Sequence, residues 1–353
     1  MSKLKVAVVG CGFVARERHI PSFLRLRNGI SLCAVCDIYK DLASEVARKF
    51  EIPRVYTDLS EMLSKEDLDI VDVCTPPRAH TSVAIEAMES GCHVLIEKPM
   101  ALEVSDCDKM IKASRKHGSK LSVVHNEIFY PPVLKARKLV SQGAVGKLTG
   151  MRILLLTHRT VYMAKKDHWI HKLPGGVLEE VGPHAVYMSL AFLENVKGVD
   201  VYARKSLEYP WVLYDDYRIE LEGKNMTSSI VISHANDCRA GEVDLFGTEG
   251  TIKMDLQSML LVLYKRKDFR PMSIALSSLS VASQIVKGVA SNAFGMMLGR
   301  TMLGHDILIE KFVESVMNDQ PVPVTPEDGR ETVRVVEMLV NRLNQKYGAR
   351  LNK

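Results

Sequence analysis

The stretch that decides the fold is Lys5–Leu26, which reads KVAVVGCGFVARERHIPSFLRL. An apolar run typical of a buried strand comes first, Gly10-x-Gly12 follows, and the remainder has the spacing of an amphipathic helix. Ala15 stands at the third position of the G-x-G-x-x-G/A pattern. A turn without side chains lets a pyrophosphate approach the backbone N–H groups at a helix N-terminus. The stretch therefore predicts a strand, a phosphate-binding turn and a helix.

The next apolar run ends in an acidic residue. It reads LCAVCDIY, and its Asp37 follows Gly12 by 25 residues (37 − 12). A carboxylate at this point can hydrogen-bond both ribose hydroxyls of an adenosine. It would repel the 2′-phosphate of NADP, which favours NAD, while Lys40 and Arg48 nearby in the sequence keep NADP possible. The alternative is a strand that merely happens to end in aspartate.

Strands and helices alternate from Lys5 to about residue 125, which predicts a parallel sheet with helices on both faces. Ligands of such sheets bind beyond the carboxyl ends of the strands. Three segments fall there, and we expect them to surround one crevice: Thr75-Pro76-Pro77, Glu97-Lys98-Pro99 and His125-Asn126. Residues 1–125 are therefore predicted to form a doubly wound, dinucleotide-binding Rossmann domain.

After Asn126 this alternation stops. Strand-like segments with turn signals between them follow, and few long helical patterns interrupt them. We expect helices from Pro183, over residues 304–318, and over residues 327–347. Residues 126–353 are predicted to form a second domain of the α+β kind.

The bulk composition agrees with two domains. The chain has 353 residues, 46% of them apolar, and is too large for one ordinary core and too apolar to be disordered. Its formal charge of +5 is spread along the sequence, so it argues only weakly for an anionic partner and does not indicate nucleic-acid binding.

Cysteine usage points to a reduced compartment. Seven cysteines at irregular spacings, with no cleavable apolar leader after Met1, predict a cytoplasmic protein without a disulfide framework. Cys33 and Cys36 mimic a C-x-x-C motif, but they lie in a strand-like run where residues three apart face opposite sides. We expect both to be core residues.

The most membrane-like segment is Ser278–Gly299. Lys287 and several serines interrupt it, so we expect no transmembrane segment here. A helix packed on a partner subunit, or a partly amphipathic surface helix, is the favoured interpretation. Gly288 and Gly295 weigh against one continuous helix.

Seven motifs then occur in one order and spacing: VAVVGCGFVA, CDIY, VDVCTPPRAH, GCHVLIEKPMA, HNEIFYPP, GAVGKLTG and GGVLEEVGPH. In these motifs the chain resembles the Gfo/Idh/MocA family, the group of glucose-fructose oxidoreductase and inositol dehydrogenase. The resemblance runs from Lys5 to about Leu190, with fainter similarity nearly to the end.

The resemblance implies a second domain built on an open, mainly antiparallel sheet that helps to form the substrate site and an oligomer interface, in a homodimer or homotetramer. It implies an NAD(P)-dependent dehydrogenase or reductase acting on CH–OH groups of a sugar, cyclitol or sugar-nucleotide. The cofactor-binding residues expected from the pattern and the resemblance are Gly10, Gly12, Phe13, Val14, Asp37, Thr75, Pro76, His80, Glu97, Lys98 and Asn126.

Hydride transfer from a secondary alcohol needs a group that accepts the hydroxyl proton. Lys98 is the first catalytic candidate, because it follows a strand and precedes Pro99, and could lie as a cation beside the reacting oxygen. The second is His184. If a helix begins at Pro183, the helix dipole disfavours the imidazolium and leaves a neutral base. The resemblance places His184 on the usual histidine of the pattern G-G-x-L-x-D-x-G-x-H.

Glu180 is the third catalytic candidate, and it falls where that pattern has aspartate. A carboxylate there can bind a substrate hydroxyl, and the extra methylene alters substrate fit. No function is assigned to Glu179. Gly182 and Pro183 disfavour an unbroken helix between Glu180 and His184, so no metal site is predicted.

A second departure is Ile128, where family members commonly carry an arginine. His158, Arg159, His168 and Trp169 are expected on the approach to the site, either as contacts or as packing. The alternative function is a non-catalytic dinucleotide-binding sensor, for which the departures at Glu180 and Ile128 would be signs of lost catalysis. Retention of Lys98 and His184 argues against it.

Overall fold

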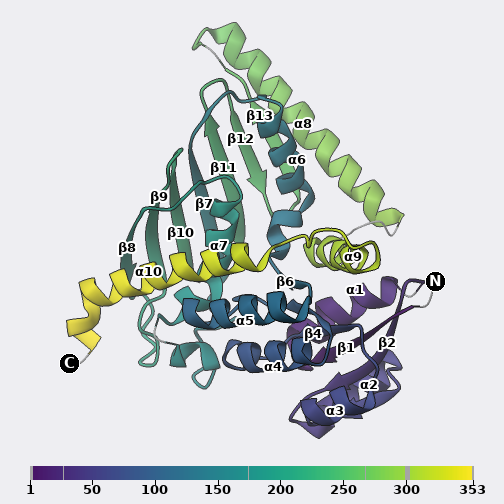
Figure 1. Cartoon of the computed structure of the whole chain (residues 1–353). Coiled ribbons are helices and arrows are strands. Elements are labelled where there is room, and N and C mark those ends of the chain that lie inside the picture. The colour runs from purple at the N-terminus through teal and green to yellow at the C-terminus, as the bar shows by residue number, and fades with distance from the viewer. Residues whose placement is uncertain (1–2, 27, 174, 267, 299–302, 352–353) are drawn as a thin grey trace. The chain divides into compact units, whose positions relative to one another are not determined.

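A computed structural model describes residues 3–26, 28–173, 175–266, 268–298 and 303–351 (Figure 1). The chain forms two compact units. Unit 1 comprises Met1–Phe129 and Met302–Arg334, and unit 2 comprises Tyr130–Thr301 and Val335–Lys353.

Unit 1 is built on a six-stranded sheet with the order β3-β2-β1-β4-β5-β6, in which all the pairings are parallel. This is the doubly wound arrangement that the alternation predicted. The strands are β1 (Leu4–Val9), β2 (Ile30–Cys36), β3 (Arg54–Tyr56), β4 (Ile70–Val73), β5 (His93–Ile96) and β6 (Leu121–Val123). The helices are α1 (Ile20–Arg25), α2 (Lys40–Phe50), α3 (Leu59–Lys65), α4 (Pro77–Glu89), α5 (Val104–His117), α9 (Gly304–Met317), and the short η1 (Ala15–His19) and η2 (Asn126–Phe129).

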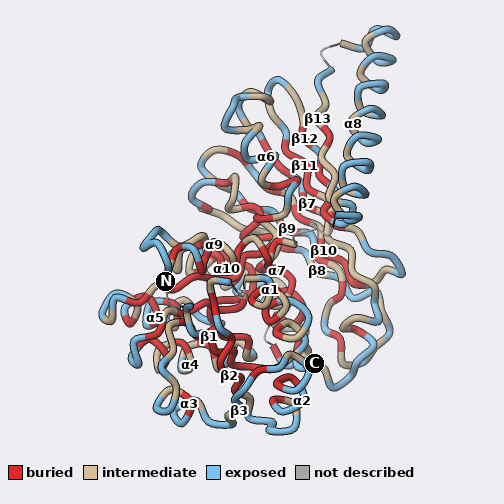
Figure 2. The backbone as a smooth tube through the Cα atoms, turned by 90° about the vertical axis from the view of Figure 1, so that its right-hand side faces the viewer, coloured by how far each residue is buried: buried red, intermediate tan, exposed pale blue. Residues whose placement is uncertain are grey.

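The central strands of this sheet read as nearly continuous apolar runs because helices cover both faces. β4 is buried at all four positions, and so are the last four residues of β1 (Figure 2). Cys33 and Cys36 are buried free thiols of β2, which confirms them as core residues. Asp72 is a charged residue inside this core, fully buried in β4.

The division of the chain differs from the predicted boundary between residues 125 and 126. Residues 302–334 belong to unit 1, so the second segment of the sequence is not one contiguous domain. The reason is the apolar face of α9, where Leu308, Ile309 and Phe312 are fully buried and the helix packs on α1, η1 and η2. The sequence pattern reveals such a face but not the partner that covers it.

Unit 2 holds a seven-stranded sheet with the order β13-β12-β11-β7-β10-β9-β8. Among the strand pairings that the described residues form in this sheet, only β7–β10 is parallel, so the sheet is mainly antiparallel, as predicted. The strands are β7 (Leu148–His158), β8 (Gly198–Arg204), β9 (Asp216–Glu222), β10 (Thr227–Asn236), β11 (Ala240–Gly247), β12 (Thr251–Asp255) and β13 (Leu260–Tyr264).

The helices of unit 2 are α6 (Pro131–Ser141), η3 (Trp169–Lys172), α7 (Val177–Leu190) and α8 (Pro271–Met297), and α10 (Pro326–Leu351) begins in unit 1 and continues through unit 2. α6 contacts β12 and β13, and α7 contacts β7 and β10 (Figure 1). The helices expected over residues 304–318 and 327–347 are confirmed as α9 and α10. α8 is one continuous helix despite Gly288 and Gly295.

Candidate active site

The turn after β1 requires glycine at its first position. Gly10 has a φ of +95°, and a Cβ added to it would lie 2.6 Å from the backbone carbon and oxygen of Cys74. A Cβ at Gly12 would meet nothing within 4 Å, so this side of the turn is open. The Arg16 N–H bonds the Gly12 carbonyl at 3.2 Å and starts the helical segment. A phosphate can therefore approach the backbone at Gly12 without steric hindrance.

Asp37 connects the ends of β1 and β2. Its Oδ2 accepts the Cys11 N–H at 2.7 Å and its Oδ1 accepts the Tyr39 N–H at 2.9 Å. Each carboxylate oxygen keeps further acceptor capacity for a ribose hydroxyl. Burial, and then the charge of Asp37, raise the pKa of the Cys11 thiol to about 12, so the turn carries no thiolate that would repel a phosphate.

Three apolar side chains stand exposed around this turn. Phe13, Ile38 and Tyr39 are 72%, 79% and 68% exposed. Apolar side chains this open on a nucleotide-binding edge offer a surface for a planar base. Phe13 was expected from the sequence, but Ile38 and Tyr39 were missed. Their signal is two bulky apolar residues placed directly after the acid that ends β2.

The loops after β4 and β5 are joined by His80. Its Nε2 lies 2.8 Å from the Thr75 carbonyl oxygen and its Nδ1 lies 2.9 Å from that of Pro99. His80 is fully buried, and burial lowers its pKa. The ring therefore links the loop after β4 to the loop after β5. The expected contact of His80 with the cofactor stays a prediction. The Thr75 hydroxyl is buried without a hydrogen-bond partner, which fits a polar ligand at this edge.

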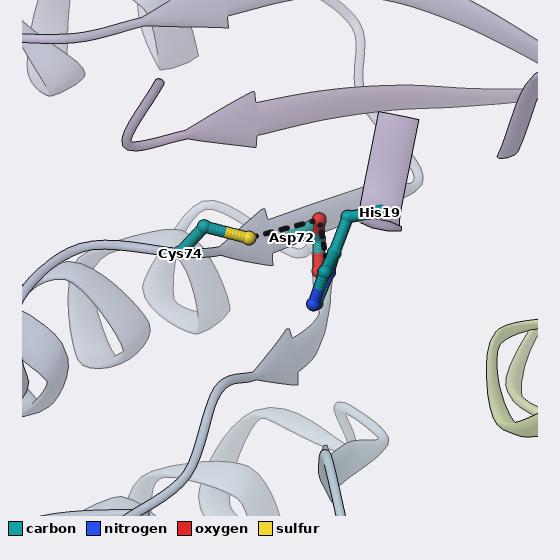
Figure 3. A group of neighbouring side chains, drawn as sticks. All are labelled: His19, Asp72 and Cys74. Carbon is teal, nitrogen blue, oxygen red and sulfur yellow. Dashed lines mark hydrogen bonds and ion pairs between the residues drawn. The ribbon is translucent and has the colours of Figure 1, made fainter. Parts of the chain in front are cut away.

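A chain of buried ionisable groups lies under the Glu97-Lys98-Pro99 loop. His19 Nδ1 is 2.9 Å from Asp72 Oδ2, and Cys74 Sγ donates to the same oxygen at 3.4 Å (Figure 3). The other ring nitrogen, Nε2, is 2.9 Å from Glu97 Oε1. Glu97 Oε2 then accepts the backbone N–H of Lys98 at 2.9 Å. The chain of contacts runs from the core strand β4 to the backbone of the predicted catalytic lysine.

The charges in this chain stabilise one another. Burial is the largest single influence on His19 and lowers its pKa, but the charge and hydrogen bond of Asp72, together with those of Cys74, outweigh burial and hold that pKa well above its ordinary value. Burial would raise the pKa of Glu97, but hydrogen bonds from His19 and from His305 hold it well below its ordinary value. An imidazolium between two carboxylates is the arrangement in which buried charges persist.

Lys98 follows β5, is half-buried, and precedes Pro99 through a cis peptide bond. Glu97 is buried and engaged with His19, so it positions the loop. Asn126 is buried in η2. Val14 is half-buried in the turn, and Pro76 immediately precedes α4. Direct cofactor contacts of these residues stay predictions.

Two groups of side chains in the described residues have ligand atoms close enough for a metal ion, and both contain His19. They are His19 with Asp72 and Cys74, and His19 with Glu97 and His305. Hydrogen bonds account for the short contacts of His19 in both, and burial raises the pKa of the Cys74 thiol, which opposes the thiolate that a metal requires. Neither group includes Glu180 or His184, which carried the metal alternative in the sequence.

In unit 2, the helix that carries His184 begins earlier than predicted. α7 starts at Val177, and Pro183 lies inside it. Gly176 has a φ of +57° at the N-cap, and Glu179 Oε2 accepts the Gly175 N–H at 2.5 Å. Glycine before the helix and a carboxylate in its first turn fix the start, which outweighs the tendency of proline to stand first. Glu179, to which no function was assigned, is thus a capping residue.

This start corrects two inferences. His184 lies about two turns into the helix and not in its first turn, where the dipole of a helix N-terminus acts. The helix is unbroken between Glu180 and His184, contrary to expectation, so residues four apart share one face. His184 Nδ1 lies 2.7 Å from the Tyr187 hydroxyl, which orients the ring instead.

Aromatic rings gather around this part of unit 2. Tyr162 is the centre, with ring centroids 5.4 Å from His168 and 5.8 Å from His234. Trp169 stacks on His168 at 5.7 Å. The pKa of His168 is lowered by burial first and by neighbouring Lys165 and His171, with Glu180 opposing, so the charge of Glu180 acts on His168. His168 and its stacked neighbour Trp169 are thus within electrostatic reach of Glu180, and their place on the approach to the site stays a prediction. His158 and Arg159 pair with Asp237.

His234 and Tyr162 were not singled out from the sequence, and His234 is the one with an unusual environment. It is fully buried in β10, neither ring nitrogen has a hydrogen-bond partner, and burial lowers its pKa to about 4. A buried neutral imidazole without partners is costly unless a ligand supplies them. The strand SSIVISHAN offers no sequence signal for this, because one histidine in an apolar strand is usually a core residue.

The fold and the nucleotide turn define a Rossmann protein with a second, mainly antiparallel sheet. A family model described as an oxidoreductase family with an NAD-binding Rossmann fold matches residues 4–125, and the GFO/IDH/MocA C-terminal domain matches residues 133–253. The chain therefore belongs to the Gfo/Idh/MocA family of oxidoreductases, and its Rossmann domain is of the NAD-binding type. The glycine turn, Asp37 and Thr75 fit this cofactor.

Curated relatives of the chain include dehydrogenases. D-glucoside 3-dehydrogenase of Escherichia coli is 35% identical over 147 residues, which is 42% of each chain. D-apiose dehydrogenase of Paraburkholderia graminis is 31% identical over 52% of this chain and 48% of that one. Inositol 2-dehydrogenase of Salmonella typhimurium is 24% identical over 71% and 74%. The chain thus spans less than half the length of the first two.

Solved structures share the whole fold. Levoglucosan dehydrogenase, in complex with NADH and L-sorbose, has a TM-score of 0.80 at 18% identity and covers 98% of both chains. An oxidoreductase from Agrobacterium radiobacter, in complex with NAD+, L-tartaric acid and magnesium, has a TM-score of 0.78 at 18% identity, with coverage of 97% and 96%. At these identities the likeness shows the fold alone.

Proposed function

We propose that the protein is an NAD-dependent oxidoreductase that transfers a hydride between the nicotinamide and a secondary hydroxyl carbon of a sugar, cyclitol or sugar-nucleotide. The observation that carries the proposal is the placement of Lys98. Its backbone is fixed by Glu97, and Glu97 is fixed by a buried imidazolium, at the carboxyl end of β5 in a nucleotide-binding sheet. The loop that carries the Lys98 cation is therefore held at the edge where ligands of such sheets bind, which suits a group that serves chemistry at the cofactor.

Bound NAD supplies the hydride acceptor. In the proposal, the Lys98 ammonium stands beside the reacting oxygen and favours its negative charge. His184 accepts the hydroxyl proton, with its ring held by Tyr187. Glu180 binds a neighbouring hydroxyl on the same face of α7. His234 offers a neutral ring nitrogen to a further polar group of the substrate.

The substrate class rests on the curated relatives, whose names specify a glucoside, apiose and inositol. Each of these names refers to a sugar, a sugar derivative or a cyclitol, and such molecules carry several hydroxyl groups. A carboxylate near histidines can form hydrogen bonds with several of these hydroxyls. The net charge of +5 gives a mild preference for an anionic substrate such as a sugar-nucleotide.

The test is a substrate panel. Purified protein is incubated with NAD or NADP and with sugars, polyols, cyclitols and nucleotide sugars, and the absorbance of the reduced cofactor is followed. The proposal expects turnover with NAD of at least one cyclic polyol or sugar. If the protein binds NAD, and nothing in the panel is oxidised with either cofactor, the non-catalytic sensor is the better account.

A further inference from the structure

Helix α8 turns its polar side toward its own sheet and its apolar side toward solvent, which is the reverse of an ordinary surface helix. Seven of its residues are partly covered, at spacings that place them along one stripe: Ser273, Ser277, Val281, Gln284, Gly288, Asn292 and Gly295. All but Val281 are polar or are glycine. None of the 27 residues of α8 is buried, and the helix follows the edge strand β13 (Figures 1 and 2). The large apolar side chains point away from the unit.

The polar stripe makes specific contacts with the β12–β13 hairpin. Gln284 pairs with the exposed edge of β13, accepting from the Leu263 N–H at 2.9 Å and donating to the Leu263 carbonyl at 3.0 Å. Asn292 donates to the Ser258 carbonyl at 2.8 Å. A Cβ at Gly288 would lie 2.7 Å from Leu260, so the helix approaches closely there. These contacts fix which side of α8 faces its own sheet and which side faces outward.

The outward side carries an apolar repeat of alternating three- and four-residue steps. Its members, together called the α8 seam, are Met272, Ala275, Leu279, Ala282, Val286, Val289, Ala293 and Met296. Each of them is exposed, Met272, Leu279 and Val286 by 66–69%. Alternating steps of three and four residues, repeated over about 36 Å of helix, are the pattern of a helix that packs along another helix.

We infer that the α8 seam pairs with the α8 seam of a second copy of this chain, as an antiparallel helix pair. The steps 3-4-3-4-3-4-3 read the same in both directions, so an antiparallel partner meets the seam in register around Gln284. The opposing pairs are Met272 with Met296, Ala275 with Ala293, Leu279 with Val289, and Ala282 with Val286. The methionines meet at the two ends and Leu279 meets Val289 further inside, while the alanines let the two backbones approach closely.

Charge and composition favour a helix over a lipid surface as the partner. By length and composition α8 could cross a membrane, with a mean hydropathy of 1.3 in its most apolar window, although the sequence had suggested a segment too polar for that. A bilayer does not require alternating three- and four-residue steps, and three of the eight seam positions are alanines, which give lipid little apolar area. Lys287 lies outside the seam, where an ammonium stays in water.

The first test compares Leu279→Glu/Val286→Glu with Lys287→Glu in the full chain. Both variants add negative charge to α8, but only the double variant puts it in the seam. Light scattering after size exclusion is expected to show that the double variant has half the mass of the wild type, while Lys287→Glu keeps the wild-type mass. Unchanged NAD binding and melting temperature verify the fold. A double variant that is folded and keeps the wild-type mass overturns the inference.

Cross-linking supplies a second test with an intact apolar seam. In a Cys238→Ser background, which removes the exposed native thiol, Ala282→Cys and Val286→Cys are made as separate proteins. Mixing the two under mild oxidation is expected to give a disulfide-linked dimer, and neither protein alone should give it efficiently. Efficient linking of each protein to itself would contradict the antiparallel register. A monomeric wild type that co-sediments with phosphatidylserine vesicles would make lipid the partner and sink the proposal.

Discussion

His19 Nε2 and Glu97 Oε1 lie 2.9 Å apart in the core of the Rossmann unit, although 78 residues separate them in the sequence. Both side chains are almost completely buried, and Asp72 binds the other side of the same imidazole. The backbone N–H of Lys98 bonds the second oxygen of Glu97. The position of the proposed catalytic lysine therefore depends on a charge in the core.

Replacing His19 by glutamine is expected to destabilise the protein strongly. Glutamine can donate one hydrogen bond but carries no charge, so two buried carboxylates would lose their counter-ion. Removing one partner of a buried ion pair costs about 3–5 kcal/mol of unfolding free energy. Urea denaturation at neutral pH measures the difference. A loss below about 1 kcal/mol would show that His19 is not an imidazolium in the folded protein.

The same pair predicts a pH dependence. The pKa of His19 is raised on folding, so its stabilising contribution is complete below the unfolded value of about 6.5 and is lost as pH rises through the folded value. The stability gap between wild type and His19→Gln should therefore be constant from about pH 5 to pH 6.5 and shrink in alkali. Denaturation curves across pH 5–10 test this. A gap that widens with pH would reverse the assigned protonation.

Two glycines of the turn should respond differently to alanine. At Gly10 a methyl group would clash with the Cys74 backbone at 2.6 Å, so Gly10→Ala should lower the melting temperature and abolish NAD binding. At Gly12 the space is open, so Gly12→Ala should keep the melting temperature. The added methyl group would lie on the side from which the pyrophosphate approaches the backbone, so NAD binding should weaken at least tenfold. Calorimetry and thermal unfolding separate the two. Wild-type NAD affinity in Gly12→Ala would mean that the pyrophosphate lies elsewhere.

The adjacent carboxylates Glu179 and Glu180 offer a matched pair. Glu179 caps α7 through the Gly175 N–H, so Glu179→Ala should cost about 1 kcal/mol of stability with little change in kcat/KM. Glu180→Ala should leave stability nearly unchanged and lower kcat/KM by a factor of ten or more, because its role is toward the substrate. The opposite pattern would exchange the two roles.

His234 separates structure from binding in another way. Leucine in place of this buried, unpartnered imidazole should raise the unfolding free energy by about 1 kcal/mol, because an unsatisfied polar group is removed. If the ring binds substrate, KM should rise at the same time. A stabilised variant with unchanged kinetics would leave His234 as a plain core residue.

The local features of the fold could be predicted from the sequence. Gly10, Gly12 and Asp37 form a pattern of fixed spacing, and the apolar runs that become β1, β4 and β5 have the length and composition of buried parallel strands. The second sheet was recognisable from its period-two alternation. Each of these sequence patterns lies within a short segment, and the local backbone geometry of that segment is what requires the pattern.

Long-range relationships left no such signal. Nothing in the sequence near His19 indicates that Glu97 and Asp72 contact it, because polar residues that pair in a core are not separated by any regular spacing along the sequence. Residues 302–334 return to the Rossmann unit through a helix whose apolar face could fit many partners. The start of α7 was misjudged because Pro183 is a strong local cue, while the capping contact of Glu179 depends on the conformation at Gly176.

The most direct test of the central claim compares binding and turnover in Lys98→Ala and His184→Ala, using the best substrate of the panel. NAD affinity, measured by calorimetry, should stay within about threefold of the wild type for His184→Ala. Turnover should fall by about 10²–10⁴-fold in each variant, as for loss of a group that handles a proton or its charge. Variants that bind NAD and turn over at wild-type rates would contradict the assignment of Lys98 and His184 to the reaction.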